Sequence, residues 1–108
     1  MTAYLIATVR KVIDRRGLEA YWASVMPSFA GTGLKPLAVY TKFKKVEGDY
    51  PLEAVILMAF PDMATAQRWY DSPAYQSARQ HRLGAADAEI IFVDGGIVPD
   101  EQRLPNFK

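Results

Sequence analysis

Two strand-like segments of the chain are apolar on both of their faces. The faces of residues 4–12 carry Leu5, Ala7 and Val9 on one side and Tyr4, Ile6 and Thr8 on the other. Residues 53–60 repeat the pattern with Val55, Leu57 and Ala59 against Ala54, Ile56, Met58 and Phe60. Side chains that fall on two faces with a period of two residues predict β-strands. Apolar residues on both faces predict that each strand is covered from two sides.

The segment between these strands predicts a helix and a second strand. Asp14 is a suitable N-cap, and apolar residues then recur at helical spacing from Leu18 to Phe29. Pro27 should bend or end this helix, and the glycines of residues 31–33 should stop it. A strand is predicted over residues 35–41, with a bent continuation over 43–46 before a turn at 47–51.

The second half of the chain repeats a helix and a strand. Pro61 and Asp62 open a helix, which Ser72 and Pro73 interrupt and restart as N-cap and first helical residue. This helix should reach about Leu83, and the fourth strand is predicted over residues 89–93.

The resulting order, β-α-β-β-α-β, is that of a ferredoxin-like α+β sandwich. Its helices cover one face of the sheet, so the apolar second face needs another cover. We expect a homodimer in which two such sheets face each other, as in a dimeric α/β barrel. We expect one domain over residues 1–96 and a tail over 97–108. The tail crosses the partner or is simply mobile, and in a further alternative it folds over the bare face.

The composition excludes several classes of protein. Thirteen Lys and Arg oppose twelve Asp and Glu, for a net charge of +1, so neither a nucleic-acid partner nor a membrane-surface partner is expected. There is no cysteine, which excludes disulfides and thiolate sites and fits a reducing compartment. No signal-peptide pattern and no apolar run of spanning length is seen. We therefore expect a cytoplasmic protein.

Several local motifs of the chain form a recognisable set. They are the opening strand with Tyr4, the helix with Tyr21 that ends in the glycine turn of residues 31–33, the hairpin over residues 46–49, and the strand-to-helix join over residues 59–62. The most specific is the stretch Trp69–Gln76 (WYDSPAYQ), which Arg82 and residues 85–88 follow. In their order and spacing these motifs resemble the bacterial family called domain of unknown function 1330, within the dimeric α/β-barrel superfamily.

The resemblance covers about residues 3–95 and implies the dimeric barrel independently of the apolar faces. It implies no established activity. The wider superfamily includes cofactor-free quinol monooxygenases, haem-handling enzymes, lactone isomerases and binding modules, so the fold does not choose among them.

Three polar side chains are predicted to share one face of the second helix. Tyr75, Arg79 and Arg82 are spaced i, i+4 and i+7. A phenol beside two guanidinium groups suits an anionic or phenolic small molecule. The alternative places Tyr75 in the core and pairs the arginines with Asp87 or Glu89.

Two further groups are candidates for the same cleft. Glu47 precedes Gly48 in a turn, where its carboxylate would act as a base or would simply be solvated. Aromatic residues would line a ligand pocket or else fill the core, namely Trp22, Trp69 and Tyr40, together with Tyr21 and Tyr70. We predict Glu47, Arg82 and Tyr75 as catalytic residues and Arg79, Trp69, Tyr40 and Trp22 as ligand-binding residues.

No metal or cofactor is predicted. His81 is the one histidine, and it falls off the face shared by Tyr75 and the two arginines, so we expect it to be exposed. The leading hypothesis is a dimeric protein that binds or converts a small aromatic or acidic metabolite. A non-catalytic dimerisation or docking module is one alternative, and a monooxygenase-like or haem-handling protein is another.

Overall fold

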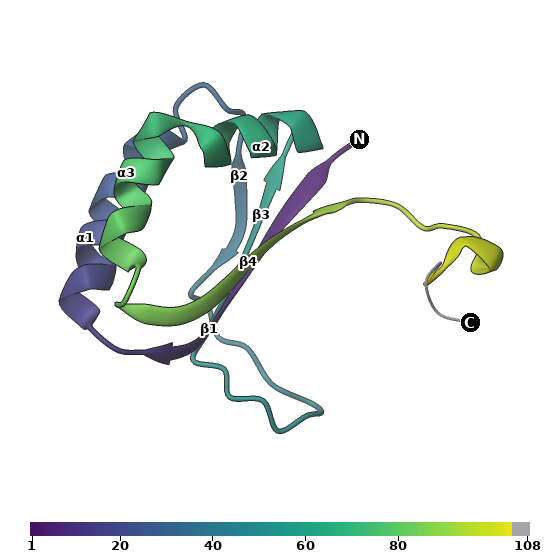
Figure 1. The fold of residues 1–108 in the computed structure, drawn as a ribbon. Coiled ribbons are helices and arrows are strands. Elements are labelled where there is room, and N and C mark those ends of the chain that lie inside the picture. Colours follow the sequence, from purple (N-terminus) through teal and green to yellow (C-terminus); the bar gives the residue numbers. More distant parts are fainter. Residues whose placement is uncertain (105–108) are drawn as a thin grey trace.

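The computed structural model describes residues 1–104 of the chain. Its elements, in chain order, are β1 (Ala3–Val12), α1 (Arg15–Ser28), β2 (Lys35–Val39), β3 (Ala54–Phe60), α2 (Met63–Asp71), α3 (Pro73–Arg82), β4 (Ala86–Asp94) and the 3₁₀-helix η1 (Asp100–Gln102). The three α-helices cover one face of a four-stranded sheet (Figure 1). The predicted ferredoxin-like α+β fold is confirmed.

The sheet is antiparallel, with the strand order β2-β3-β1-β4. Leu5 lies opposite Met58 of β3 and Phe92 of β4, and these side chains point toward the helices. Ile6 lies opposite Leu57 and Ile91 and points the other way. Because side chains alternate along a strand, this register sets an inner face against an outer one.

Capping side chains set where each helix begins. The carboxylate of Asp14 accepts a hydrogen bond from the Arg16 backbone N–H before α1. Asp62 accepts from the Thr65 backbone N–H before α2. The side-chain hydroxyl of Thr65, and then its backbone N–H, hold the pKa of Asp62 below its ordinary value. Ser72 ends α2 and caps α3, so the predicted interruption of the second helix is confirmed.

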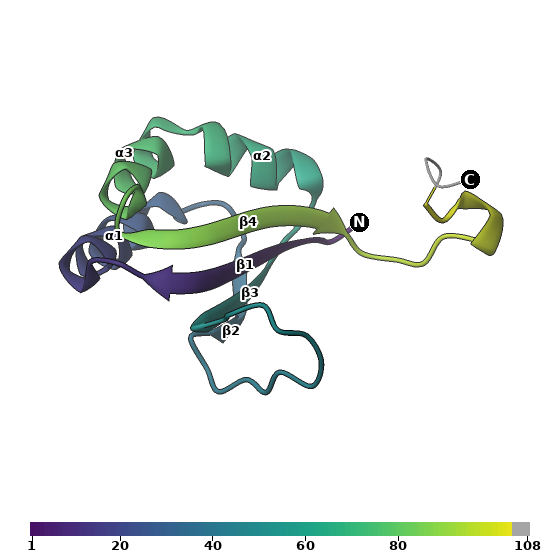
Figure 2. The ribbon, with the colours of Figure 1, turned by 60° about the horizontal axis from the view of Figure 1, so that its bottom comes forward.

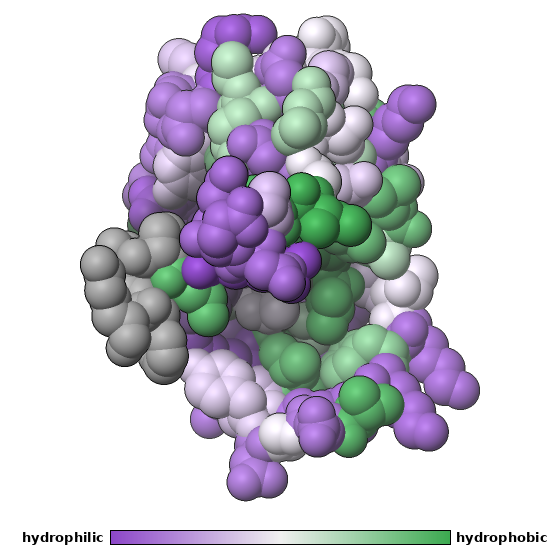
Figure 3. Space-filling model, turned by 90° about the vertical axis from the view of Figure 1, so that its right-hand side faces the viewer, coloured by the Kyte–Doolittle hydropathy of each residue, from purple (hydrophilic) through white to green (hydrophobic). Residues whose placement is uncertain are grey.

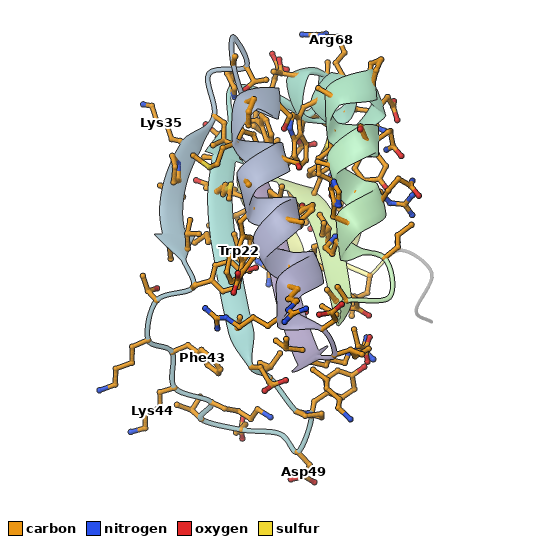
Figure 4. The ribbon with its side chains drawn as sticks, turned by 90° about the vertical axis from the view of Figure 1, so that its left-hand side faces the viewer. Trp22, Lys35, Phe43, Lys44, Asp49 and Arg68 are labelled. Carbon is orange, nitrogen blue, oxygen red and sulfur yellow. The ribbon has the colours of Figure 1, made fainter. Side chains whose placement is uncertain are left out.

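The strand predicted over residues 43–46 was wrong. β2 ends at Val39, and Tyr40 takes a left-handed conformation with φ of 55°. No β-ladder continues from this point, so residues 41–53 form an exposed loop without helix or strand. Figure 4 shows Phe43, Lys44 and Asp49 on this loop, below α1 and the sheet.

The core is centred on Trp69 of α2. Its indole packs on the ring of Tyr75, with centroids 4.1 Å apart, and stacks on Phe29 at 5.2 Å. The indole N–H donates to the Ser28 hydroxyl, 2.9 Å away. A buried polar atom keeps a partner in this way, which avoids the cost of an unmade hydrogen bond.

The outer face of the sheet, called the open face below, has no cover from the helices (Figure 2). Its side chains come from alternate residues of the three longest strands, namely Tyr4, Ile6, Thr8, Val55, Leu57, Ala59, Glu89, Ile91 and Val93. Figure 3 shows apolar side chains gathered on the side of the molecule away from α1 and α3. The expectation of an apolar second face is therefore met.

The described part of the tail, residues 97–104, does not cover the open face. Residues 98–104 are exposed, and Figures 1 and 2 both show the chain leading away from the body after β4. Residues 97–104 therefore do not fold back over the sheet, and the end of the predicted tail, residues 105–108, lies outside the part of the chain that the structure describes. No helix within residues 1–104 has the length and apolar character needed to cross a membrane.

Candidate functional site

A cavity of about 340 Å³ lies between α1 and the inner face of the sheet. We call it the inner cavity. Its walls are almost wholly apolar and come from the odd-numbered residues of β1, from β3 and β4, and from one side of α1. The apolar lining includes Leu5, Ala7, Val9, Val25, Ile56 and Ile90. Such a space favours the apolar body of a small molecule.

Polar groups reach the inner cavity at the junction of α1 and α3. The Tyr21 side chain and the Arg82 side chain both line it. The Tyr21 hydroxyl lies 3.1 Å from the Tyr75 hydroxyl, and either can be the donor. The guanidinium carbon of Arg82 lies 5.6 Å from the centroid of the Tyr21 ring. Two phenols and one cation therefore meet at one end of an apolar chamber.

The electrostatics of this end fix the protonation states. Burial raises the pKa of Tyr21 well above its ordinary value, and the neighbouring Tyr75 raises it further. Burial disfavours the charge of Arg82, but its interactions with Tyr75 and Tyr21 outweigh burial, so the pKa of Arg82 is raised. The site therefore offers a neutral hydroxyl and a permanent positive charge.

Trp22 and Tyr40 line the cavity where β2 ends. The Trp22 indole N–H donates to the Tyr40 hydroxyl at 2.8 Å, and the two rings meet edge to face with centroids 5.1 Å apart. Figure 4 shows Trp22 on the side of α1 next to β2 and β3. The pair ties α1 to the start of the exposed loop.

A second hollow, of about 420 Å³, lies on the other side of Arg82. We call it the outer groove. Its lining comes from α2, from α3 with the residue after it, and from β4, namely Gln67, Tyr70, Arg79, Arg82, Leu83, Ala88, Ile90 and Phe92. Arg82, Ala88 and Ile90 line both hollows.

The structure brings most of the predicted site residues together, but not all. Trp22, Tyr40, Trp69 and Arg82 line the inner cavity. Tyr75 is fully buried and does not line the inner cavity. Its hydroxyl forms a hydrogen bond with the hydroxyl of Tyr21, which does line the cavity.

The other predicted residues lie elsewhere. Arg79 lines the outer groove and not the inner cavity, although it shares a helix face with Arg82. Glu47 is exposed on the loop over residues 41–53 and lines neither hollow. His81 is exposed on α3, as expected, and lines neither hollow. Within residues 1–104, no group of three His, Asp or Glu side chains is placed to hold a metal ion.

The alternative in which the arginines pair with β4 carboxylates is not what the structure shows. Glu89 pairs with Arg10 of β1 on the open face. Arg79 and Arg82 form no ion pair with any residue that the structure describes. The other half of that alternative, Tyr75 in the core, is correct.

The sequence did not predict Gln67 as a lining residue of the outer groove, nor that Tyr21 lies at the polar end of the inner cavity with its hydroxyl next to that of Tyr75. Gln67 is on α2, and no spacing rule links it to arginines on α3. Tyr21 was only one of several aromatic candidates, because its hydrogen bond with Tyr75 joins residues 54 positions apart.

Comparisons with known proteins agree with this fold. The family model described as Domain of unknown function (DUF1330) matches residues 2–96. A protein of unknown function from Rhodopseudomonas palustris is similar in structure, with a TM-score of 0.69 and 19% identity over 91% of this chain and 84% of that one. No curated protein matches the sequence.

Two other solved structures are similar. One is a dimeric ferredoxin-like protein of unknown function from Jannaschia, with a TM-score of 0.58 and 15% identity over 88% of this chain and all of that one. The other is a cofactor-independent oxygenase from Streptomyces nogalater, with a TM-score of 0.57 and 11% identity over 93% of this chain and 97% of that one. At these identities the likeness shows the fold.

Proposed function

On the premise that the chain belongs to the DUF1330 family, we propose that it is a homodimeric protein that binds a small aromatic metabolite in the inner cavity without a cofactor. Membership of this family confirms the resemblance found in the sequence. The family is named for its unknown function, so the proposal depends on the cavity and its walls.

The observation that carries the proposal is an apolar chamber with one cation at its end. Its volume of about 340 Å³ falls within the usual range of small-molecule sites. A cavity lined by apolar groups favours an apolar ligand over water. Trp69 and Trp22 add aromatic walls on which a ring packs.

Arg82 and Tyr21 would orient the ligand. The guanidinium donates hydrogen bonds to a hydroxyl, carbonyl or oxyanion of the ligand. The neutral Tyr21 hydroxyl, held by Tyr75, adds a donor or an acceptor at the same end. The favoured ligand therefore has a ring system with one oxygen substituent.

The dimer would use the open face of the sheet. Ile91 and Val93 keep 53% and 42% of their surface exposed in the single chain, and they adjoin Ile6 and Tyr4 of β1. A contiguous apolar sheet face is typical of a protein interface. The Jannaschia protein of the same fold is dimeric.

The experiment is calorimetric titration of the protein with 1-naphthol, a neutral ring compound with one hydroxyl. Ala7 lines the inner cavity from β1, so Ala7→Leu fills the space and should abolish binding while the protein stays folded. Arg82→Gln should weaken binding at least about tenfold, as expected for one hydrogen bond to a charged group.

Arg68→Gln is the matched control. Arg68 is exposed on α2 and points into solvent at the end of the molecule (Figure 4). If Ala7→Leu binds 1-naphthol as the parent protein does, the cavity is not the site. If neither 1-naphthol nor a wider set of ring compounds binds, the non-catalytic docking module replaces the proposal.

A second candidate is oxygenation without a cofactor, the activity of the Streptomyces protein of this fold. The observation that favours it is the positive charge of Arg82 at the wall of an apolar chamber. Such a charge stabilises an anionic, electron-rich form of an aromatic substrate. Consumption of oxygen that depends on both the bound compound and Arg82 would support this candidate.

A further inference from the structure

We propose that the outer groove is a second binding site, which takes the carboxylate of a small organic acid between Arg79 and Arg82. It is separate from the ligand site proposed for the inner cavity, although Arg82 lines both. The observation behind it is a pair of half-buried guanidinium groups without an acidic partner.

The two arginines have unmet hydrogen-bonding capacity. They are spaced i, i+3 in the last turn of α3, which places them side by side. The Nε of each is buried and has no hydrogen-bond partner among residues 1–104. Both arginines line the outer groove, and neither has an ion-pair partner among residues 1–104. The donors of their guanidinium groups that face the groove are therefore open to a ligand or to solvent.

The alternation of side chains along β4 explains why neither of its nearby acids, Asp87 and Glu89, pairs with the two arginines. Ala88 and Ile90 face the helices and line the groove. Asp87 and Glu89 have the opposite parity, and Glu89 pairs with Arg10 on the open face. A strand sends neighbouring side chains to opposite faces, so these carboxylates point away from the arginines.

One more carboxylate lies near the groove but is engaged. The Gln67 side-chain nitrogen donates to Asp71 at 3.1 Å. Asp71 does not line the groove, and this bond leaves the Gln67 carbonyl oxygen free to accept a hydrogen bond. The groove therefore has two cationic donors and one neutral amide.

The rest of the lining selects an organic acid over an inorganic ion. The side chains of Phe92, Ile90 and Tyr70 add apolar and aromatic surface to the lining of the groove. These surfaces contact the hydrocarbon part of a ligand while the arginines hold its carboxylate. A volume of about 420 Å³ accommodates a single ring with an acid group, as in benzoate.

The groove is reached from the edge of the sheet. β4 is an edge strand in the order β2-β3-β1-β4, and Figure 2 shows α2 and α3 above it. Within residues 1–104 no other strand covers that edge, so an acid would enter between the helices and β4.

The test uses benzoate, with backbone and arginine Nε signals followed by NMR. In the parent protein, benzoate should shift the Nε–H signals of Arg79 and Arg82. Arg79→Gln should weaken benzoate binding at least about tenfold, as expected for the loss of a charge-assisted hydrogen bond. Arg68→Gln removes the same charge from an exposed position of α2 and should leave the affinity unchanged.

Ala7→Leu separates this inference from the proposed function. It fills the inner cavity only, so benzoate should still bind, whereas 1-naphthol should not. Arg79→Gln should give the reverse pattern. Loss of benzoate binding in Ala7→Leu, or equal affinity in Arg79→Gln and Arg68→Gln, would overturn the outer site whatever 1-naphthol does.

Inorganic phosphate tests the class of ligand. It carries negative charge but has no apolar part to contact Phe92 and Ile90, so it should bind at least about tenfold more weakly than benzoate. Phosphate binding equal to that of benzoate would overturn the assignment to organic acids. Absence of any benzoate-dependent shift at Arg79 would overturn the site itself.

Discussion

The hydroxyls of Tyr21 and Tyr75 lie 3.1 Å apart and join α1 to α3 behind the inner cavity. Their rings meet edge to face, with centroids 6.2 Å apart and an angle of 82° between the ring planes. Tyr75 is fully buried, and Tyr21 is only partly exposed. The pair fixes the polar end of the cavity, because it holds the Tyr21 ring beneath the Arg82 guanidinium.

Tyr21→Phe should make the stability of the protein less sensitive to alkaline pH. Burial, and then the neighbouring Tyr75, raise the pKa of Tyr21 in the folded protein. In the unfolded chain a tyrosine ionises near pH 10, so above about that pH unfolding releases a proton. The contribution of Tyr21 to the free energy of unfolding is complete at a pH below the pKa of tyrosine in the unfolded chain. It is lost as the pH rises toward the higher pKa of Tyr21 in the folded protein.

Urea unfolding between about pH 8 and 11 measures this effect around the tyrosine pKa. The parent protein should lose stability more steeply above about pH 10 than Tyr21→Phe does. Tyr50→Phe, in the exposed loop, should follow the parent curve. Identical slopes for all three proteins would show that Tyr21 is not held neutral by its surroundings.

Gly17→Ala should destabilise the protein, although alanine is the better helix former. A Cβ atom at Gly17 would lie 2.6 Å from Cβ of Ala85 and 3.0 Å from the carbonyl oxygen of His81. In an open helix the change would stabilise by about 1 kcal/mol. Here the clash forces α1 away from the end of α3, and overpacking of this kind costs about 1–3 kcal/mol.

Chemical unfolding of Gly17→Ala beside Arg16→Ala measures the cost. Arg16 is exposed in the same helical turn, so its replacement should change stability by less than about 0.5 kcal/mol. A gain in stability for Gly17→Ala would mean that the close approach of α1 and α3 is relaxed in solution.

Ile91→Glu should convert the proposed dimer into a folded monomer. Ile91 lies opposite Ile6 on the open face, and a carboxylate there would be buried without a partner when two sheets meet. Light scattering after size exclusion gives the mass, and circular dichroism checks the fold. Ile13→Glu is the control, since Ile13 is exposed beyond the end of β1. A dimer that survives Ile91→Glu would place the interface elsewhere.

Tyr40→Phe should speed the release of 1-naphthol from the inner cavity. The change removes the hydrogen bond from Trp22, and with it the link between α1 and the loop. The lost bond should cost about 1 kcal/mol or less, since the pair is partly solvated. Stopped-flow fluorescence measures the dissociation rate, with Tyr50→Phe as the control. An unchanged rate would show that the Trp22–Tyr40 contact does not govern exit.

Local sequence rules predicted the elements whose causes are local. Asp14, Asp62 and Ser72 each act within three residues of their own position, so their caps follow from the sequence. The two strands with apolar residues on both faces could likewise be predicted, because side chains alternate between the faces of a strand with a period of two residues. β4 begins at Ala86, three residues before the predicted start, because pairing with the end of β1 imposes strand geometry on residues that do not favour it.

The site depended on contacts that no local rule contains. Arg79 and Arg82 share a helix face, as the spacing predicts. Because of how α2 and β4 pack against α3, Arg79 lines only the outer groove, whereas Arg82 lines both hollows. Glu47 was expected at the cleft because it follows a predicted strand. That strand is absent after Tyr40, so Glu47 lies on the exposed loop.

The alternation of side chains along β4 separates the proposed dimer interface from the two proposed ligand sites. Residues 89, 91 and 93 belong to the open face, whereas 88, 90 and 92 face the helices and line the two hollows. Drift at one set leaves the other untouched, because no side chain of β4 contributes to both. A substitution at residue 88, 90 or 92 would therefore alter a proposed ligand site without altering the proposed dimer interface, although the residues of the two surfaces are neighbours on the same strand.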